Sequence, residues 1–163
     1  MGLDMYLYIR KQTYIGSTET ELYKGFYDPE LRVFEDSARE KGRSLAKSTD
    51  FEVGYWRKAN AIHSWIVNNC TEGVDNCEPI YISMEKLEEL NSLCNKVLED
   101  PSKAEELLPT RDGFFFGGTD YDEWYLKKIQ YTADLLTTVI MWMKHEKKDD
   151  EHSFYGVIYQ ASW

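Results

Sequence analysis

The chain has 163 residues and a formal net charge of −10, so it is long enough for one domain with a sizeable core and too short for two. Nearly all of the acidic excess lies beyond residue 50, and such a surface repels nucleic acid, so we expect no direct nucleic-acid binding. The sequence has no apolar run long enough to cross a bilayer and no signal peptide, so we expect no membrane partner.

The cysteines bear on location and on metal binding. They are three in number and lack a C-x-x-C spacing, which is typical of proteins in a reducing, cytoplasmic compartment. A metal site from His63, Cys70 and Cys77 can be drawn, but it lacks a paired second motif. We therefore expect buried free thiols, no metal and no cofactor.

The first strand is predicted by a strict alternation from Leu3 to Arg10. Leu3, Met5, Leu7 and Ile9 form an apolar face, and the opposite face carries Tyr6 and Tyr8 among polar residues. Residues 11–50 have no clear periodicity, so we interpret them as a long irregular excursion with a hairpin around Glu21–Tyr27.

The densest cluster of polar and aromatic residues follows a short predicted strand at Phe51–Tyr55. A helix over 56–69 would place Tyr55, Ala59, Ile62, Ile66 and Cys70 on one apolar stripe. Trp56, Asn60 and His63 would line one shoulder of that stripe. Two interpretations stay open: the shoulder is the edge of a ligand site, or its residues pack half-buried with their polar tips in water.

The second half of the chain is predicted to be mainly helical. Ser83 is a suitable N-cap for a helix over 84–99, and Thr119 or Asp120 for a longer one over 121–144. The other predicted elements are a strand at Pro79–Ile82, a helical turn at Lys103–Leu108, a buried strand or turn at Phe114–Phe116 and a final strand at Phe154–Trp163.

Two sequence features are candidates for chemical sites. Gly117-Gly118-Thr119 before a helix could cradle a phosphate, but it lacks the P-loop lysine, so a capped turn explains it better. His63 could act as a general base with Asp4, Asp120 or Asp122 as its partner. No nucleophile, metal or kinase motif accompanies it, so the sequence leaves catalysis open but favours a protein that is not an enzyme.

Several motifs are shared with a known group of proteins. They are Met1–Leu7, Gly54–His63, Leu107–Pro109, Gly113–Gly117 with Thr119–Asp122, and the ending Tyr159–Trp163. On these motifs the chain resembles a family of small proteins encoded by bacteriophages and prophages. The resemblance implies a setting in the cytoplasm of a bacterial host, and by analogy a role against a host defence. It implies no particular activity.

The predicted fold is a single α+β domain over residues 1–163. A small, mainly antiparallel sheet would include the first and last strands as neighbours, with about three helices on one side.

Two functions from different classes fit these residues. The first is capture of a small nucleotide-like ligand without catalysis, in which aromatic rings stack and cations meet phosphate. Its candidate ligand-binding residues are Tyr6, Tyr8, Trp56, Arg57, Lys58, Asn60, His63 and Thr119. The second is an acidic interaction protein that inhibits a host defence protein, such as a nuclease, by direct binding or by DNA mimicry. Self-association into a homo-oligomer is compatible with both.

Overall fold

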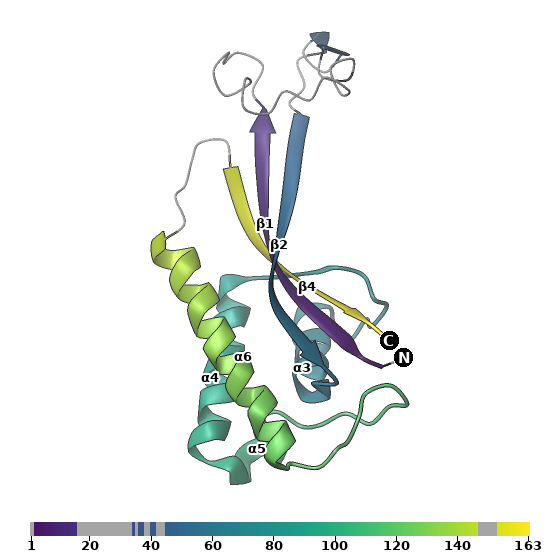
Figure 1. Cartoon of the computed structure of the whole chain (residues 1–163), viewed down its shortest axis with the longest axis vertical. Coiled ribbons are helices and arrows are strands. Elements are labelled where there is room, and N and C mark those ends of the chain that lie inside the picture. The colour runs from purple at the N-terminus through teal and green to yellow at the C-terminus, as the bar shows by residue number, and fades with distance from the viewer. Residues whose placement is uncertain (1, 16–33, 35, 38–39, 42–44, 147–152) are drawn as a thin grey trace. The chain divides into compact units, whose positions relative to one another are not determined.

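The computed structural model describes residues 2–15, 34, 36–37, 40–41, 45–146 and 153–163. These residues form an α+β protein with a four-stranded antiparallel sheet in the order β2-β1-β4-β3, which confirms the predicted fold class and the pairing of the first and last strands (Figure 1). The strands are β1 (Asp4–Ile15), β2 (Leu45–Arg57), β3 (Ile80–Ile82) and β4 (Ser153–Ser162).

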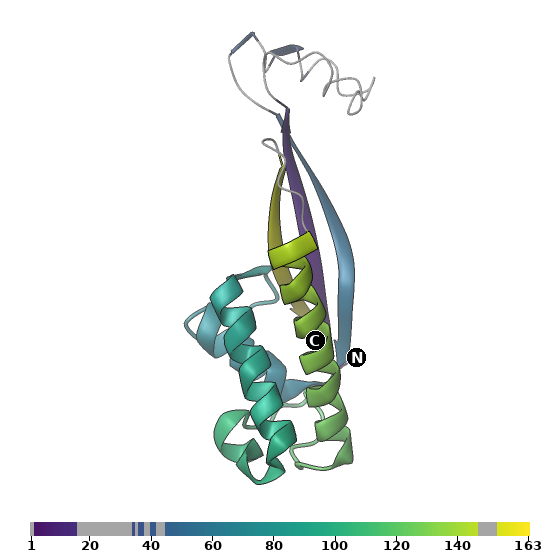
Figure 2. The same ribbon diagram turned by 90° about the vertical axis from the view of Figure 1, so that its left-hand side faces the viewer.

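The helices follow in the second part of the chain. They are α3 (Asn60–Cys70), α4 (Met84–Glu99), a 3-10 turn (Pro101–Lys103), α5 (Ala104–Leu107), α6 (Glu123–Met141) and a π-helical turn (Trp142–Glu146). Helices α4 and α6 lie side by side (Figure 2). Across that contact Asn91 Nδ2 donates to Thr137 Oγ1 at 3.2 Å. Among the residues described, no helix has the length and apolar character that a membrane span requires.

The chain divides into two compact units. One comprises Met1–Ile9, Phe51–Lys147 and Gly156–Trp163, and the other Arg10–Asp50 and Lys148–Tyr155. Within the second unit, the Arg10 guanidinium forms a two-pronged ion pair with Asp50, with nitrogen–oxygen distances of 2.6 and 2.7 Å. Those hydrogen bonds hold the pKa of the Asp50 carboxyl below its usual value. The candidate site described below belongs to the first unit.

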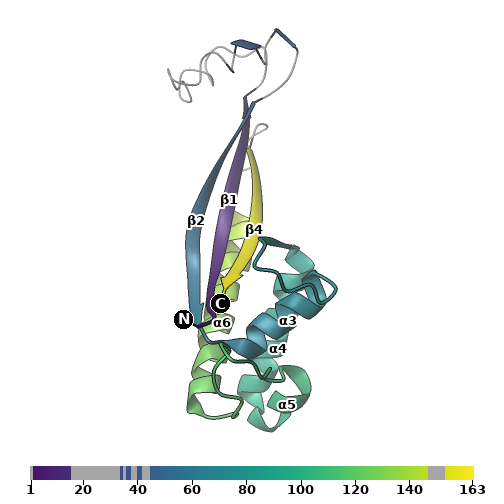
Figure 3. The ribbon, with the colours of Figure 1, turned by 90° about the vertical axis from the view of Figure 1, so that its right-hand side faces the viewer.

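The core of the first unit lies between the sheet and α6. The predicted apolar face of β1 is buried, and so is the face of β4 that carries Tyr159. Figure 3 shows α6 behind strands β2, β1 and β4. The helix supplies an apolar stripe at helical spacing against these strands. The buried side chains of this layer include Leu3, Met5, Leu7, Val157, Tyr159, Ala161, Ile129, Ala133 and Leu136.

Three contacts also join helix α6 to the end of strand β2. The contacts are Lys128 Nζ to Lys58 O at 2.8 Å, Trp56 Nε1 to Thr132 Oγ1 at 2.8 Å, and the side chain of Leu135 against Gly54. A Cβ atom added at Gly54 would lie 2.3 Å from Leu135 Cδ2, so a larger residue here would force the leucine or the helix to shift.

The predicted helix over 56–69 begins too early. Trp56 is in β2, and α3 starts only at Asn60. Tyr55 is therefore exposed rather than part of the apolar stripe, whereas Ala59 and Ile62 are buried as predicted. The reason is tertiary, because backbone pairing with β1 outweighs the helical periodicity that these residues also satisfy.

Strand pairing also extends into the region predicted as irregular. Strand β1 continues from Arg10 to Ile15, and β2 begins at Leu45. The residues of these extensions are mainly polar, so they do not alternate between apolar and polar as the residues of a half-buried strand do. The hairpin predicted around Glu21–Tyr27 lies outside the described residues.

The structure confirms the predicted N-cap of α4 and corrects that of α6. Ser83 caps α4 as predicted, because its hydroxyl accepts from Lys86 N at 3.2 Å. The cap of α6 is Asp122, not Thr119 or Asp120, since Asp122 Oδ1 accepts from Tyr125 N at 2.9 Å. The predicted element at Phe114–Phe116 is a turn.

Candidate functional site

Lys58 joins β2 to α3 in an unusual backbone conformation. Its φ of 56° lies in the left-handed region, which few residues other than glycine adopt. Both of its backbone groups are hydrogen-bonded, since Lys58 N donates to Leu3 O at 2.8 Å and Lys58 O accepts from Lys128 Nζ at 2.8 Å. A conformation of this kind costs on the order of 1–3 kcal/mol and persists only where the surroundings impose it.

Two glycines fit closely around the side chain of Lys58. A Cβ atom added at Gly117 would lie 3.1 Å from Lys58 Cβ, and one added at Gly2 would lie 3.1 Å from Lys58 Cε. Gly117 itself has a φ of 90°, which a larger residue would adopt only with strain. The chain therefore closes around the aliphatic stem of this lysine and holds its side chain in place.

Beside Lys58 lies a cavity of about 200 Å³. It is placed at the N-terminal end of α3, whose cap residue Ala59 provides no side-chain hydrogen bond and whose first turn has no acidic residue. The first backbone N–H groups of a helix have no partner within it, so this end favours an anion. The lining residues are Lys58, Ala59, Asn60, Ala61, Ile62, Gly118, Asp120, Asp122, Trp124, Tyr125, Lys128 and Ile129.

The charges around the cavity have two signs. Lys58 and Lys128 provide positive charge, and the pKa of Lys128 is lowered by burial, with Asp122 opposing that shift and Lys58 adding to it. Asp120 and Asp122 provide negative charge at the start of α6. A ligand that fits this arrangement carries an anionic group together with hydroxyl or amino donors.

The rim of the cavity includes an exposed tryptophan. Trp124 is 68% exposed although it also lines the cavity. Lys127 Nζ lies 4.8 Å from the centroid of its ring, and the same ammonium forms an ion pair with Glu123 at 2.7 Å. A large aromatic side chain with this exposure at a cavity mouth is available to stack on a planar group.

Asn60 lines the cavity as a structural clamp. Its Nδ2 donates to Phe116 O at 3.1 Å and to Gly118 O at 2.9 Å, and its Oδ1 accepts from Arg111 N at 3.3 Å. Both amide protons and the carbonyl oxygen are thus engaged. Asn60 fixes the segment that forms one wall of the cavity.

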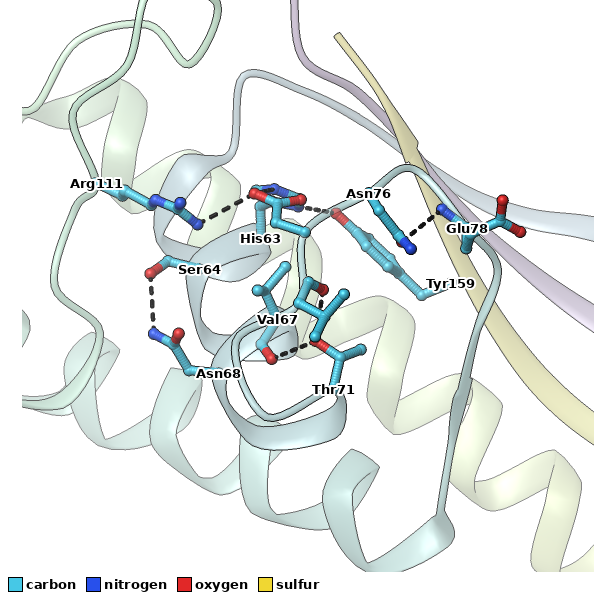
Figure 4. Close-up of polar contacts among 11 residues, drawn as sticks. His63, Ser64, Val67, Asn68, Thr71, Asn76, Glu78, Arg111 and Tyr159 are labelled. Carbon is cyan, nitrogen blue, oxygen red and sulfur yellow. Dashed lines mark hydrogen bonds and ion pairs between the residues drawn. The ribbon is translucent and has the colours of Figure 1, made fainter.

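His63 lies in a buried hydrogen-bonded network outside the cavity (Figure 4). It is 1% exposed, with Nδ1 2.7 Å from the Tyr159 hydroxyl and Nε2 3.1 Å from Asp75 Oδ2. Arg111 Nη1 lies 3.2 Å from the same carboxylate oxygen. Because a carboxylate only accepts, Nε2–H donates to Asp75, and Nδ1 accepts from Tyr159.

The electrostatic state of His63 follows from its burial. Burial lowers the pKa of His63, and the carboxylate of Asp75 opposes that shift. Burial also raises the pKa of the Tyr159 hydroxyl well above its usual value, so this group keeps its proton. Each ring nitrogen of a neutral His63 therefore has one partner within the protein.

The other predicted ligand-binding residues do not line the cavity. Trp56 is 3% exposed, and its indole is bonded to Thr132. Tyr6 lies on the opposite face of β1, where its ring centroid is 6.1 Å from that of Tyr8 and 5.3 Å from that of Tyr55. The side chains of Arg57 and Thr119 are exposed. Of the eight candidates, Lys58 and Asn60 are at the cavity.

Sequence reasoning missed Trp124 and Lys128 as site residues. They are four positions apart on α6, so they lie on one face of the helix. Their spacing beside a glycine-rich turn could have indicated the site, but the broad apolar arc of the same helix concealed it.

Comparisons with protein-family models, curated proteins and solved structures found no match to this chain. Among the residues the structure describes, no group of three or more His, Cys, Asp or Glu side chains could hold a metal ion.

Proposed function

We propose that this protein captures a small, phosphate-bearing, nucleotide-like ligand in the Lys58 cavity without changing it chemically. The observation that supports this most directly is the strained backbone of Lys58, whose side chain is held between two glycines at the edge of the cavity. Strained backbone conformations cluster at binding and active sites, which is why Lys58 is singled out beside the cavity.

Different residues of the cavity would bind different groups of such a ligand. A phosphate group would lie at the N-terminal end of α3, where the helix dipole and the charges of Lys58 and Lys128 favour it. Sugar hydroxyls would donate to Asp120 or Asp122, which also line the cavity. An inorganic anion alone would form no hydrogen bond to those carboxylates, because it brings no hydroxyl donor.

The placement of His63, the candidate general base, supports capture without reaction. His63 is buried, each of its ring nitrogens is already bonded, and it does not line the cavity. In the phage setting implied by the sequence resemblance, a protein of this kind would act against a host defence by sequestering its nucleotide signal.

Isothermal titration calorimetry tests the proposal. The wild-type chain is titrated with cyclic and linear nucleotides, and the same titrations are repeated with Lys58→Gln, which keeps a side chain of similar length but removes the charge. Losing a hydrogen bond to a charged group is worth about 1.5–3 kcal/mol, so we expect affinity to fall about tenfold to a hundredfold.

The matched control is Lys103→Gln. Lys103 is an exposed lysine that pairs with Asp100 at 3.4 Å and does not line the cavity, so its replacement should leave affinity unchanged. Equal losses in both variants would contradict a specific role for Lys58. The absence of heat with every nucleotide, from a protein shown to be folded, would refute the proposed function.

A further inference from the structure

The size of the Lys58 cavity limits what it can enclose. Pockets that surround drug-sized ligands usually measure roughly 300–1,000 Å³. The cavity here measures about 200 Å³, so it encloses a phosphate and part of a sugar rather than a whole nucleotide. The remainder of a bound nucleotide, including its base, must then lie outside the enclosed volume.

Trp124 provides the surface on which that remainder can lie. It is both a lining residue of the cavity and 68% exposed, so its indole extends from the cavity into solvent. On α6 it is one turn before Lys128, which places the ring and the cation on the same helix face. A ligand whose phosphate lies near Lys128 thus has its base within reach of the indole.

We infer that the base of the ligand stacks on Trp124 outside the cavity, so that the site binds nucleoside monophosphates with little selectivity among bases. This inference rests on the proposed function. Stacking uses the π-face that every base has, and it tolerates changes of base because no hydrogen bond reads an edge. Lys127 lies over the indole of Trp124 and adds positive charge there, but a cation over a ring does not distinguish one base from another.

The small volume of the cavity also predicts how affinity depends on the size of the ligand. A dinucleotide presents a second phosphate and a second sugar, and a cavity smaller than one nucleotide encloses neither. A dinucleotide should therefore bind no more tightly than the matching mononucleotide. A ribose phosphate should bind more weakly, since it fills the cavity but lacks the base.

The experiment compares AMP, UMP and ribose 5-phosphate as calorimetric ligands for the wild type and for Trp124→Ala. Base–aromatic stacking is worth enough that its loss should weaken both nucleotides by about fivefold or more. Ribose 5-phosphate has no base to stack, so Trp124→Ala should weaken its binding much less than that of the nucleotides. The control is Phe114→Ala, because Phe114 is 96% exposed and does not line the cavity, so all three affinities should be retained.

Each outcome decides between the inference and the function on which it rests. If ribose 5-phosphate binds as tightly as AMP, or Trp124→Ala leaves the nucleotides unaffected, the stacking inference is wrong while anion capture stands. A large preference for AMP over UMP that survives Trp124→Ala would likewise overturn it, since an edge contact would then read the base. If none of the three ligands binds the folded wild type, both proposals are refuted.

Discussion

At Lys58 the chain leaves strand β2 and enters helix α3 within three residues. The positive φ, the two backbone hydrogen bonds and the close approach of Gly2 and Gly117 all act on this one residue. A sequence cannot display that convergence, because lysine has no special preference for the left-handed region. The sequence makes Lys58 a candidate only as a cation that could meet phosphate, whereas its backbone conformation is imposed by the surrounding structure.

His63 illustrates the opposite case at the residue scale. Its place beside Trp56 and Asn60 in the sequence suggested a ligand-binding shoulder, yet the three side chains are bonded to the protein itself. The sequence could not distinguish these outcomes, because the partners Asp75 and Tyr159 lie 12 and 96 positions away. The network connects α3, the segment after it and β4 in one buried site.

The stability of the protein should fall in acid because of His63. Burial lowers its pKa below the ordinary 6.5, so the unfolded state binds more protons as the pH falls through that value. Urea unfolding at pH 7.5 and pH 5.5 should give a lower free energy of unfolding at the acidic pH. His63→Gln should flatten that difference while costing about 1–3 kcal/mol at pH 7.5.

The control for this measurement is His145→Gln, since the side chain of His145 is exposed. It should leave the dependence on pH as in the wild type. An equal slope in the wild type and in His63→Gln would show that another group is responsible.

At the element scale, the long α6 was the most predictable part of the fold. In the sequence, Tyr125, Ile129, Leu136 and Val139 recur at helical spacing, which predicts a helix with one buried face, and all four side chains are buried. The boundary between β2 and α3 was not predictable, because Tyr55 and Trp56 satisfy both a helical and an alternating pattern. Only the neighbouring strand β1 decides between the two.

The contact between α6 and β2 depends on Gly54. Gly54→Ala would place a Cβ atom 2.3 Å from Leu135 Cδ2, so the helix or the leucine must shift. Overpacking of this kind costs about 1–3 kcal/mol. Chemical denaturation should show that loss, and Gly54→Ala combined with Leu135→Ala should remove its steric part.

Gly118→Ala provides the comparison, because a Cβ atom there meets no atom within 4 Å. It should leave the free energy of unfolding nearly unchanged. If Gly54→Ala is as harmless as Gly118→Ala, the helix and the strand are not held in the close contact described.

At the scale of the whole molecule, the two ends of the chain meet in the sheet. Strand β4 contributes Tyr159 and Ala161 to the core beside β1. This arrangement was predictable from two alternating patterns, one at each end of the sequence. The candidate cavity was not, because it combines α3, the loop at Gly118 and α6, and no local sequence pattern joins them.

Deletion of Tyr159–Trp163 should abolish folding. The truncation removes buried side chains from the centre of the sheet and leaves β1 without part of its partner strand. Circular dichroism and solubility of the truncated chain provide the measurement. A soluble, folded truncation would show that β4 is dispensable.

Capture without reaction can be tested directly by recovering the ligand. The wild type is dialysed to equilibrium against AMP, its bound fraction is measured, and the ligand is released by heat and identified by mass spectrometry. We predict saturable binding of one AMP per chain, recovered unchanged, with binding strongly reduced in Lys58→Gln. No binding by the folded protein, or recovery of a new product, would contradict the account.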